Sequence, residues 1–142
     1  MMPSHHQRIA QHIRTDPYAA WLGAKIEAVE PGYSRVRLQI THDMHNFHQV
    51  AHGGLLFSLA DIAFAAASNA RGQTAVALQV STTFMRAASA GDVLVAECHE
   101  RDLNGPIGLY DITIHREADD ALILQCQATV YRKKHWFIPP DA

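Results

Sequence analysis

The stretch HGGLLFSLADIAFAAASNARG, residues 52–72, places one aspartate inside the most apolar run of the chain. Leucine, phenylalanine, isoleucine and alanine fill most positions, and their spacing does not form a single stripe. We therefore predict a helix over residues 53–71 that is apolar on almost every side and is ended by Gly72. Such a helix has to be covered by the rest of the protein, so it decides the fold.

The remaining sequence supplies strands that can cover this helix. Alternating or short apolar runs between turn residues predict strands over residues 24–30, 34–40, 74–87, 93–101, 108–117 and 121–133. Short turns join most of these segments, which favours antiparallel pairing. We expect an α+β fold, a curved antiparallel sheet wrapped around one long central α-helix, and another subunit on any helix surface left uncovered.

The two ends and one loop complete a single expected domain, residues 1–142. A short polar helix is predicted at about 4–15, capped by Ser4 and ended by Asp16-Pro17. Residues 18–22 are interpreted as an apolar connector, and histidines crowd a loop over 41–51. A short tail is expected over about residues 134–142, in which Pro139-Pro140 ends any strand.

The bulk composition argues against several classes of protein. The chain has 142 residues, 48% of them hydrophobic and 18% charged, with a formal net charge of -2. That is enough apolar material for a core and gives no electrostatic reason for a nucleic-acid partner. No window approaches the ~20 apolar residues of a membrane span, and no signal peptide is visible. We expect a cytoplasmic protein with no membrane partner, and we interpret Cys98 and Cys126 as buried, reduced thiols.

Asp61, in the middle of the predicted helix, has three interpretations. It could face water at a helix edge, form an ion pair across an interface, or do chemistry in a cleft. The preceding His52-Gly53-Gly54 favours the third. A first helical turn presents unpaired N–H groups with positive partial charge, and glycine lets a ligand approach the backbone. That combination suits a carbonyl oxygen that becomes an oxyanion during acyl transfer.

Helix geometry constrains how Gly53 and Asp61 can cooperate. They are eight positions apart, which separates them by about 12 Å along the axis and about 80° around it. An aspartate side chain cannot span that gap. If both residues act on one substrate, they must come from two antiparallel copies of the chain related by a two-fold axis.

Two segments carry a resemblance to a known family. NFHQVAHGG, residues 46–54, with the LLFSLADIAFAAASNARG that follows it, and FMRAASAGDVLVAE, residues 84–97, resemble the hotdog-fold acyl-CoA thioesterases of the phenylacetate-degradation (PaaI) type. The similarity runs from about Asp16 to Lys133. It implies a hotdog fold and a homodimer with antiparallel helices, often paired again into a tetramer.

The resemblance also implies roles for individual residues. The oxyanion donor falls on the Gly53 amide, and the carboxylate that acts as nucleophile or general base falls on Asp61. Asn46 matches the loop asparagine that positions the thioester or water, and His52 matches the motif histidine, a structural or polarising contact. These four residues are the expected catalytic set.

Further residues are candidates for binding the substrate. Ile62 stands where the family often has a small polar residue, and Phe47 stands where it often has glycine. The identity of the acyl group in the substrate therefore cannot be inferred from the family. The expected substrate-binding residues are His48, Gly54, Phe47, Ile62 and, for the phosphates of coenzyme A, Arg86, Arg132 and Lys133. The clustered loop histidines are interpreted as a polar, pH-sensitive loop, with no metal site and no cofactor.

The leading hypothesis is hydrolysis of an acyl-CoA thioester with an aryl- or phenylacetyl-like acyl group. A hydratase or dehydratase of acyl thioesters is the first alternative, with His52 and Asp61 sharing proton transfer. A non-catalytic protein that binds acyl-CoA is the second.

Overall fold

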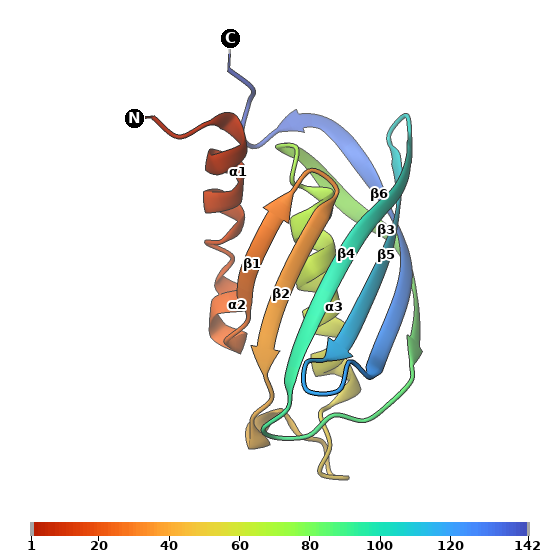
Figure 1. Ribbon diagram of the computed structural model, residues 1–142. Helices are drawn as coiled ribbons and strands as arrows, with labels where there is room; N and C mark the ends of the chain where they lie inside the picture. The colour runs from red at the N-terminus through yellow and green to blue at the C-terminus, as the bar shows by residue number, and fades with distance from the viewer. Residues whose placement is uncertain (1, 142) are drawn as a thin grey trace.

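The computed structural model describes residues 2–141 and contains one six-stranded antiparallel sheet with the strand order β1-β2-β4-β5-β6-β3 (Figure 1). The helices are α1 (His5–Ile13), α2 (Pro17–Leu22), the 3-10 helix η1 (His42–Met44) and α3 (Gly53–Ser68). The strands are β1 (Lys25–Glu30), β2 (Tyr33–Gln39), β3 (Gln73–Phe84), β4 (Val93–Asn104), β5 (Ile107–Arg116) and β6 (Leu122–Trp136). No helix among these residues is long and apolar enough to cross a membrane.

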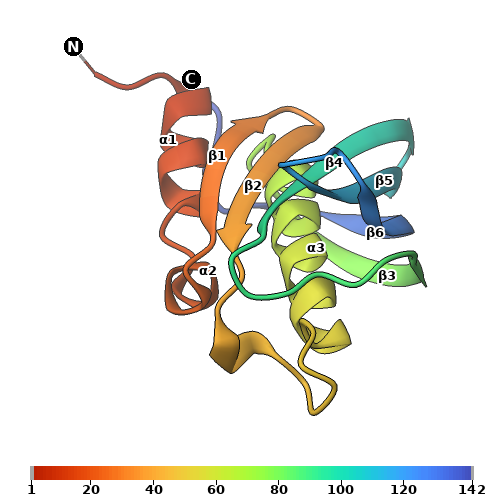
Figure 2. The ribbon, with the colours of Figure 1, turned by 60° about the horizontal axis from the view of Figure 1, so that its bottom comes forward.

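The sheet curves around α3, as the apolar sequence of this helix predicted (Figure 2). Leu59, Ala63 and Ala67 of α3 are completely buried, and the ring of Phe64 packs edge-on against Tyr110 of β5, with 5.6 Å between ring centroids. This burial of one helix by a curved antiparallel sheet confirms the expected α+β arrangement.

One face of α3 is not covered. Gly54, Phe57, Asp61 and Ala65 are spaced at three to four residues and are all exposed, so they form a line along the helix that we call the open stripe. The edge strand β3 is also exposed and carries large apolar side chains, with Leu78 56% exposed and Phe84 53% exposed. The protein therefore presents an apolar helix face and an unpaired strand edge to its surroundings.

The connector expected over residues 18–22 is wrong, because these residues lie in α2. Asp16 accepts hydrogen bonds at Oδ1 from the amides of Tyr18 and Ala19, at 2.9 and 3.3 Å, and Pro17 occupies the first helical position. Gly23 then ends the helix with a φ of 85°. An Asp-Pro pair can start a helix as well as stop one, and here it starts α2.

Several boundaries differ from the sequence prediction. The helix ends at Ser68 rather than residue 71, and the strand predicted to residue 87 ends at Phe84. The tail predicted from residue 134 starts later, because β6 continues to Trp136, where it pairs with Gln73 at the start of β3. The N-terminal helix is confirmed, with a Ser4 capping box, and Cys98 and Cys126 are buried and not disulfide-bonded.

Candidate active site

The start of α3 is fixed by His52. The imidazole Nδ1 of His52 accepts a hydrogen bond of 2.9 Å from the amide of Gly54, which places the proton of the neutral ring on Nε2. A Cβ atom on Gly54 would lie 3.2 Å from that nitrogen, so the close cap favours glycine. The Gly54 amide is therefore occupied within the protomer, and His52 acts as a helix cap.

The amide of Gly53 is free. Among residues 2–141 no hydrogen bond uses this N–H, and it belongs to the first turn of α3, where amides lack partners within the helix. Gly53 lines a cavity of about 310 Å³ together with Leu56 of α3 and Phe84 of β3. The unpaired donor thus belongs to a residue that borders a cavity, as an amide that holds an anionic oxygen would need to.

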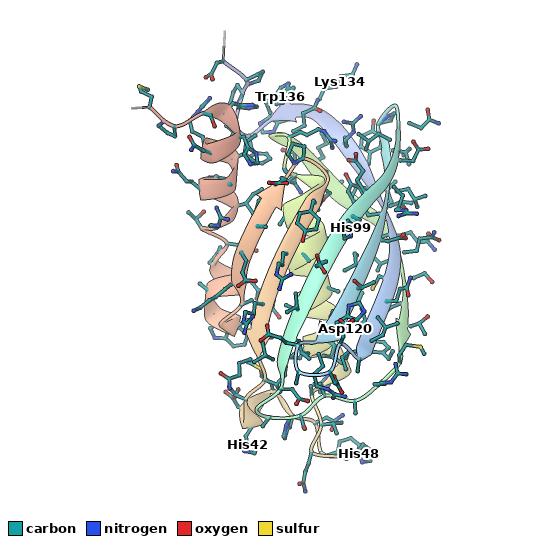
Figure 3. The ribbon with its side chains drawn as sticks, viewed as in Figure 1. His42, His48, His99, Asp120, Lys134 and Trp136 are labelled. Carbon is teal, nitrogen blue, oxygen red and sulfur yellow. The ribbon has the colours of Figure 1, made fainter. Side chains whose placement is uncertain are left out.

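The loop before α3 is held by its own hydrogen bonds. The Asn46 amide donates to the carbonyl of Val50 over 2.8 Å, and the Asn46 side-chain oxygen accepts from the amide of His48 over 2.9 Å. Gln49 adopts a positive φ of 63° to close this turn. Phe47 is 89% exposed, and its ring is tilted against that of His48 with 4.2 Å between the ring centroids. His48 projects away from the body of the protomer (Figure 3).

Asp61 lies on the open stripe without a partner. Within the described part of the chain, its carboxylate takes part in no hydrogen bond or ion pair. The surrounding protein partly desolvates it, and this burial, followed by the negative charge of Asp16, raises the pKa of Asp61 above its ordinary value of 3.8. An ion pair within the protomer therefore does not explain why an aspartate occupies this position on α3.

The structure does not bring Gly53 and Asp61 together within one protomer. Both lie on the continuous helix α3, about 12 Å apart along its axis. Ile62, the neighbour of Asp61, is 5% exposed and belongs to the packed core, about 100° around the helix from the aspartate.

The basic residues expected at coenzyme A divide between two ends of the protomer. Arg86 lines the cavity of Gly53 and donates to the carbonyl of Leu122 over 3.0 Å. Arg132 pairs with Ala75 near the start of β3, and Lys133 follows it on β6. Lys134 lies at the opposite end of the molecule from His48 in Figure 3, so Arg132 and Lys133 do not reach Gly53 of the same chain.

The loop histidines do not gather into a metal site. Among residues 2–141 no group of three His, Cys, Asp or Glu side chains is placed to hold an ion. His45 instead accepts a hydrogen bond at Nε2 from the amide of Ala90 over 2.9 Å, which ties the loop to the segment before β4.

A cavity of about 610 Å³ lies on the side of α3 away from the Gly53 cavity, and the sequence analysis missed it. Tyr18 and Trp21 of α2 line it opposite Ser58, and the Tyr18 hydroxyl and Ser58 Oγ are 2.8 Å apart. The only signal for this wall was the Asp-Pro helix start, which had been interpreted as a stop.

Comparisons with known proteins identify the family of this chain. The chain matches the family model of the Thioesterase superfamily over residues 48–123. It is 40% identical over 109 residues to the acyl-coenzyme A thioesterase PaaI of Escherichia coli K12, covering 77% of this chain and 78% of that protein.

Two solved structures are similar over most of the chain. The E. coli PaaI protein from the phenylacetic acid degradation operon superimposes with a TM-score of 0.88 at 33% identity, covering 93% of this chain and 96% of that one. A variant of the phenylacetic acid degradation protein PaaI from Thermus thermophilus has a TM-score of 0.79 at 36% identity, covering 83% and 100%. These findings confirm the resemblance and the hotdog fold: the chain belongs to the thioesterase superfamily.

Proposed function

We propose that this protein hydrolyses acyl-CoA thioesters at an active site shared by two copies of the chain. The observation that carries the proposal is the pair of unpartnered groups on α3, the Gly53 amide and the Asp61 carboxylate. Membership of the thioesterase superfamily and the name of the E. coli relative, an acyl-coenzyme A thioesterase, support the reaction class.

The exposed surfaces support a homodimer. If two open stripes pack antiparallel about a two-fold axis, Gly53 of each copy comes level with Asp61 of the other. The exposed apolar residues of β3 would be covered in the same contact. Such a pair also brings the Arg132 and Lys133 end of one copy toward the Gly53 end of the other, where they and Arg86 would meet the phosphates of coenzyme A.

The chemistry follows from these positions. The thioester carbonyl oxygen accepts a hydrogen bond from the Gly53 amide, which stabilises the negative charge as the tetrahedral intermediate forms. Asp61 of the other copy either attacks the carbonyl carbon or takes a proton from a water that attacks it. The C–S bond then breaks, coenzyme A leaves as the thiol, and the acyl group leaves as a carboxylate.

The other residues of the loop have supporting roles. Asn46, whose side-chain oxygen is bound to the amide of His48, would use its free NH2 group to orient the water or the thioester. His52 holds the helix start, and Phe47 and His48 would contact substrate or the neighbouring copy. We extend the proposal to an aryl- or phenylacetyl-like acyl group, a dimer paired into a homotetramer, and a cytoplasmic location.

A complementation experiment tests the shared site. Asp61→Asn and Gly53→Pro chains carrying different tags are produced separately and together, and free thiol release from phenylacetyl-CoA is measured. Each variant alone should have at most about one hundredth of the wild-type activity. Random pairing yields half mixed dimers, each with one intact site, so roughly a quarter of wild-type activity should return.

The same preparations exclude the alternatives. Failure of the mixed sample to recover activity, although mixed dimers are isolated through both tags, would show that each site lies within one chain. Loss of enoyl-CoA absorbance without thiol release would indicate a hydratase. Tight acyl-CoA binding with neither reaction would indicate a binding protein.

A further inference from the structure

A third cavity, lined by the α3 residues Ile62 and Ala65 that follow Asp61, has no role in the proposal above. Its volume is about 410 Å³, within the range of small-molecule sites, and it lies between α1, β1, α3 and the segment after β6. We call it the Phe137 cavity. Its apolar walls are Ile13, Ile26, Ile62, Ala65, Ala66 and Phe137.

The mouth of the Phe137 cavity adjoins the proposed catalytic carboxylate. Ala65 lines the cavity and lies one helical turn after Asp61 on the open stripe, about 6 Å further along the axis. Asp16 also borders the cavity and is near enough for its charge to act on Asp61. A group bonded to a carbonyl carbon held at Asp61 could therefore extend directly into this space.

Most polar side chains on the cavity wall already have hydrogen-bond partners, and the exception is the ring of His12, which has none among the described residues and contacts the ring of Phe137. Asn69 donates to the carbonyl of Ala65 over 2.9 Å and accepts from the amide of Ala75 over 2.8 Å. The Thr15 hydroxyl donates to the carbonyl of His12 over 2.5 Å. Asp16 accepts from the capped amides of α2, and the Thr74 hydroxyl bonds His135 over 3.0 Å. The cavity therefore offers a ligand mainly hydrocarbon surface and few free hydrogen-bonding groups.

The wall made by the end of the chain is fixed in place. The Phe137 amide donates to the carbonyl of Gly72 over 2.9 Å, and the Phe137 ring lies 5.5 Å from the ring of His12 on α1. His5 bonds the carbonyl of Ile138 over 2.9 Å. Figure 1 shows both ends of the chain at the same end of the molecule. The two termini thus form a wall with a defined shape, which is what discrimination by size requires.

We propose that the Phe137 cavity receives the hydrocarbon part of the acyl group, and that Ala65 and Phe137 determine which acyl groups fit. This inference rests on the proposed thioesterase function. The fitting groups are uncharged aryl-acetyl or medium-length alkyl chains. Acyl groups that end in a carboxylate are disfavoured, because Asp16 and Asp61 place negative charge at the mouth.

The experiment compares thiol release from phenylacetyl-, octanoyl-, acetyl- and succinyl-CoA by the full-length protein. Ala65→Leu narrows the cavity, and we expect at least a tenfold loss in kcat/KM for the two large substrates relative to acetyl-CoA. Phe137→Ala widens it and should move the preference from phenylacetyl- toward octanoyl-CoA. Ala20→Leu is the matched control, since Ala20 is exposed on α2 and lines none of the cavities described above.

The outcomes separate the two proposals. No thiol release from any substrate by the wild-type protein would overturn the thioesterase function. Thiol release with unchanged substrate ratios in both cavity variants, or succinyl-CoA as the preferred substrate, would overturn the role of the Phe137 cavity alone. Ala65→Leu could alter the oligomeric state, which a sizing column would show. In that case Phe137→Ala, a substitution away from the open stripe, decides whether the Phe137 cavity determines acyl-group selectivity.

Discussion

Replacing Gly53 with proline would remove one hydrogen-bond donor, the backbone N–H at the start of α3. The local structure should accept the change. Proline is favoured at the first helical position, and His52 already has the φ of −61° and ψ of 137° that a residue before proline adopts. A Cβ atom at Gly53 would lie 3.6 Å from the ring of Phe84, an ordinary contact. No hydrogen bond of the described chain is lost, because the Gly53 amide makes none.

The expected effect is therefore on the reaction rather than on folding. Loss of one oxyanion donor typically lowers kcat by about 10²–10³, equivalent to about 2.7–4 kcal/mol of transition-state stabilisation. Gly53→Ala is the control, because it keeps the N–H and adds only the Cβ atom. We would measure thiol release at saturating acyl-CoA, together with thermal unfolding and the oligomeric state. A folded Gly53→Pro protein that turns over as fast as Gly53→Ala would refute the assignment of this amide.

Three further predictions concern the charged residues Asp61 and Lys133. Because the pKa of Asp61 is raised, the fold disfavours the charged carboxylate, and Asp61→Asn should therefore raise the Tm at neutral pH. This gain in Tm should fade as the pH falls through the raised pKa toward 3.8, where the carboxyl group is protonated in both the folded and the unfolded chain. An equal gain in Tm at pH 3 would contradict the prediction. The same shift predicts that kcat/KM rises with pH along an acid limb centred above 3.8, and a midpoint below that value would exclude Asp61 as the titrating group. Lys133→Ala should raise KM for acyl-CoA by at most about fivefold, because an exposed pair between a lysine and a phosphate contributes up to ~1 kcal/mol of binding free energy. KM for short thioesters that lack phosphates should not change.

Much of the fold could be predicted because its signals are local. The apolar run of α3 and the alternating strands gave the sheet wrapped around a helix. The prediction of a connector over residues 18–22 was wrong because an Asp-Pro pair can either end one helix or begin the next. Packing of α2 against β1 favours the second possibility here. The extent of β6 was missed because its last residues are strand only through pairing with β3, some 60 residues earlier in the chain.

The candidate site shows the same division. His52, Gly53 and Asp61 could be proposed as candidates because helix starts and isolated charges are recognisable within a few residues of sequence. The Phe137 cavity could not be predicted, since its walls come from residues as far apart as Ile13 and Phe137. Their proximity depends on the tertiary packing of the two chain ends and leaves no periodic pattern in the sequence.

The eight-residue spacing on α3 leads to one more consequence. In an antiparallel pair that levels Gly53 of one copy with Asp61 of the other, the residue halfway between them faces itself across the two-fold axis. That residue is Phe57, which lies on the open stripe and is 38% exposed. Two Phe57 rings would then pack together at the centre of the interface, where aromatic side chains contribute most to association.

Phe57→Cys tests this placement directly. The two native cysteines are buried, so the new thiol would be the only accessible one among the described residues. A short bis-maleimide should join two copies efficiently, because helices in contact have axes only about 8–10 Å apart. Trp21→Cys is the matched control, being 78% exposed on α2 and away from the open stripe. If Trp21→Cys is joined as readily as Phe57→Cys, the two-fold axis does not pass beside Phe57, and the pairing of Gly53 with Asp61 across it is lost.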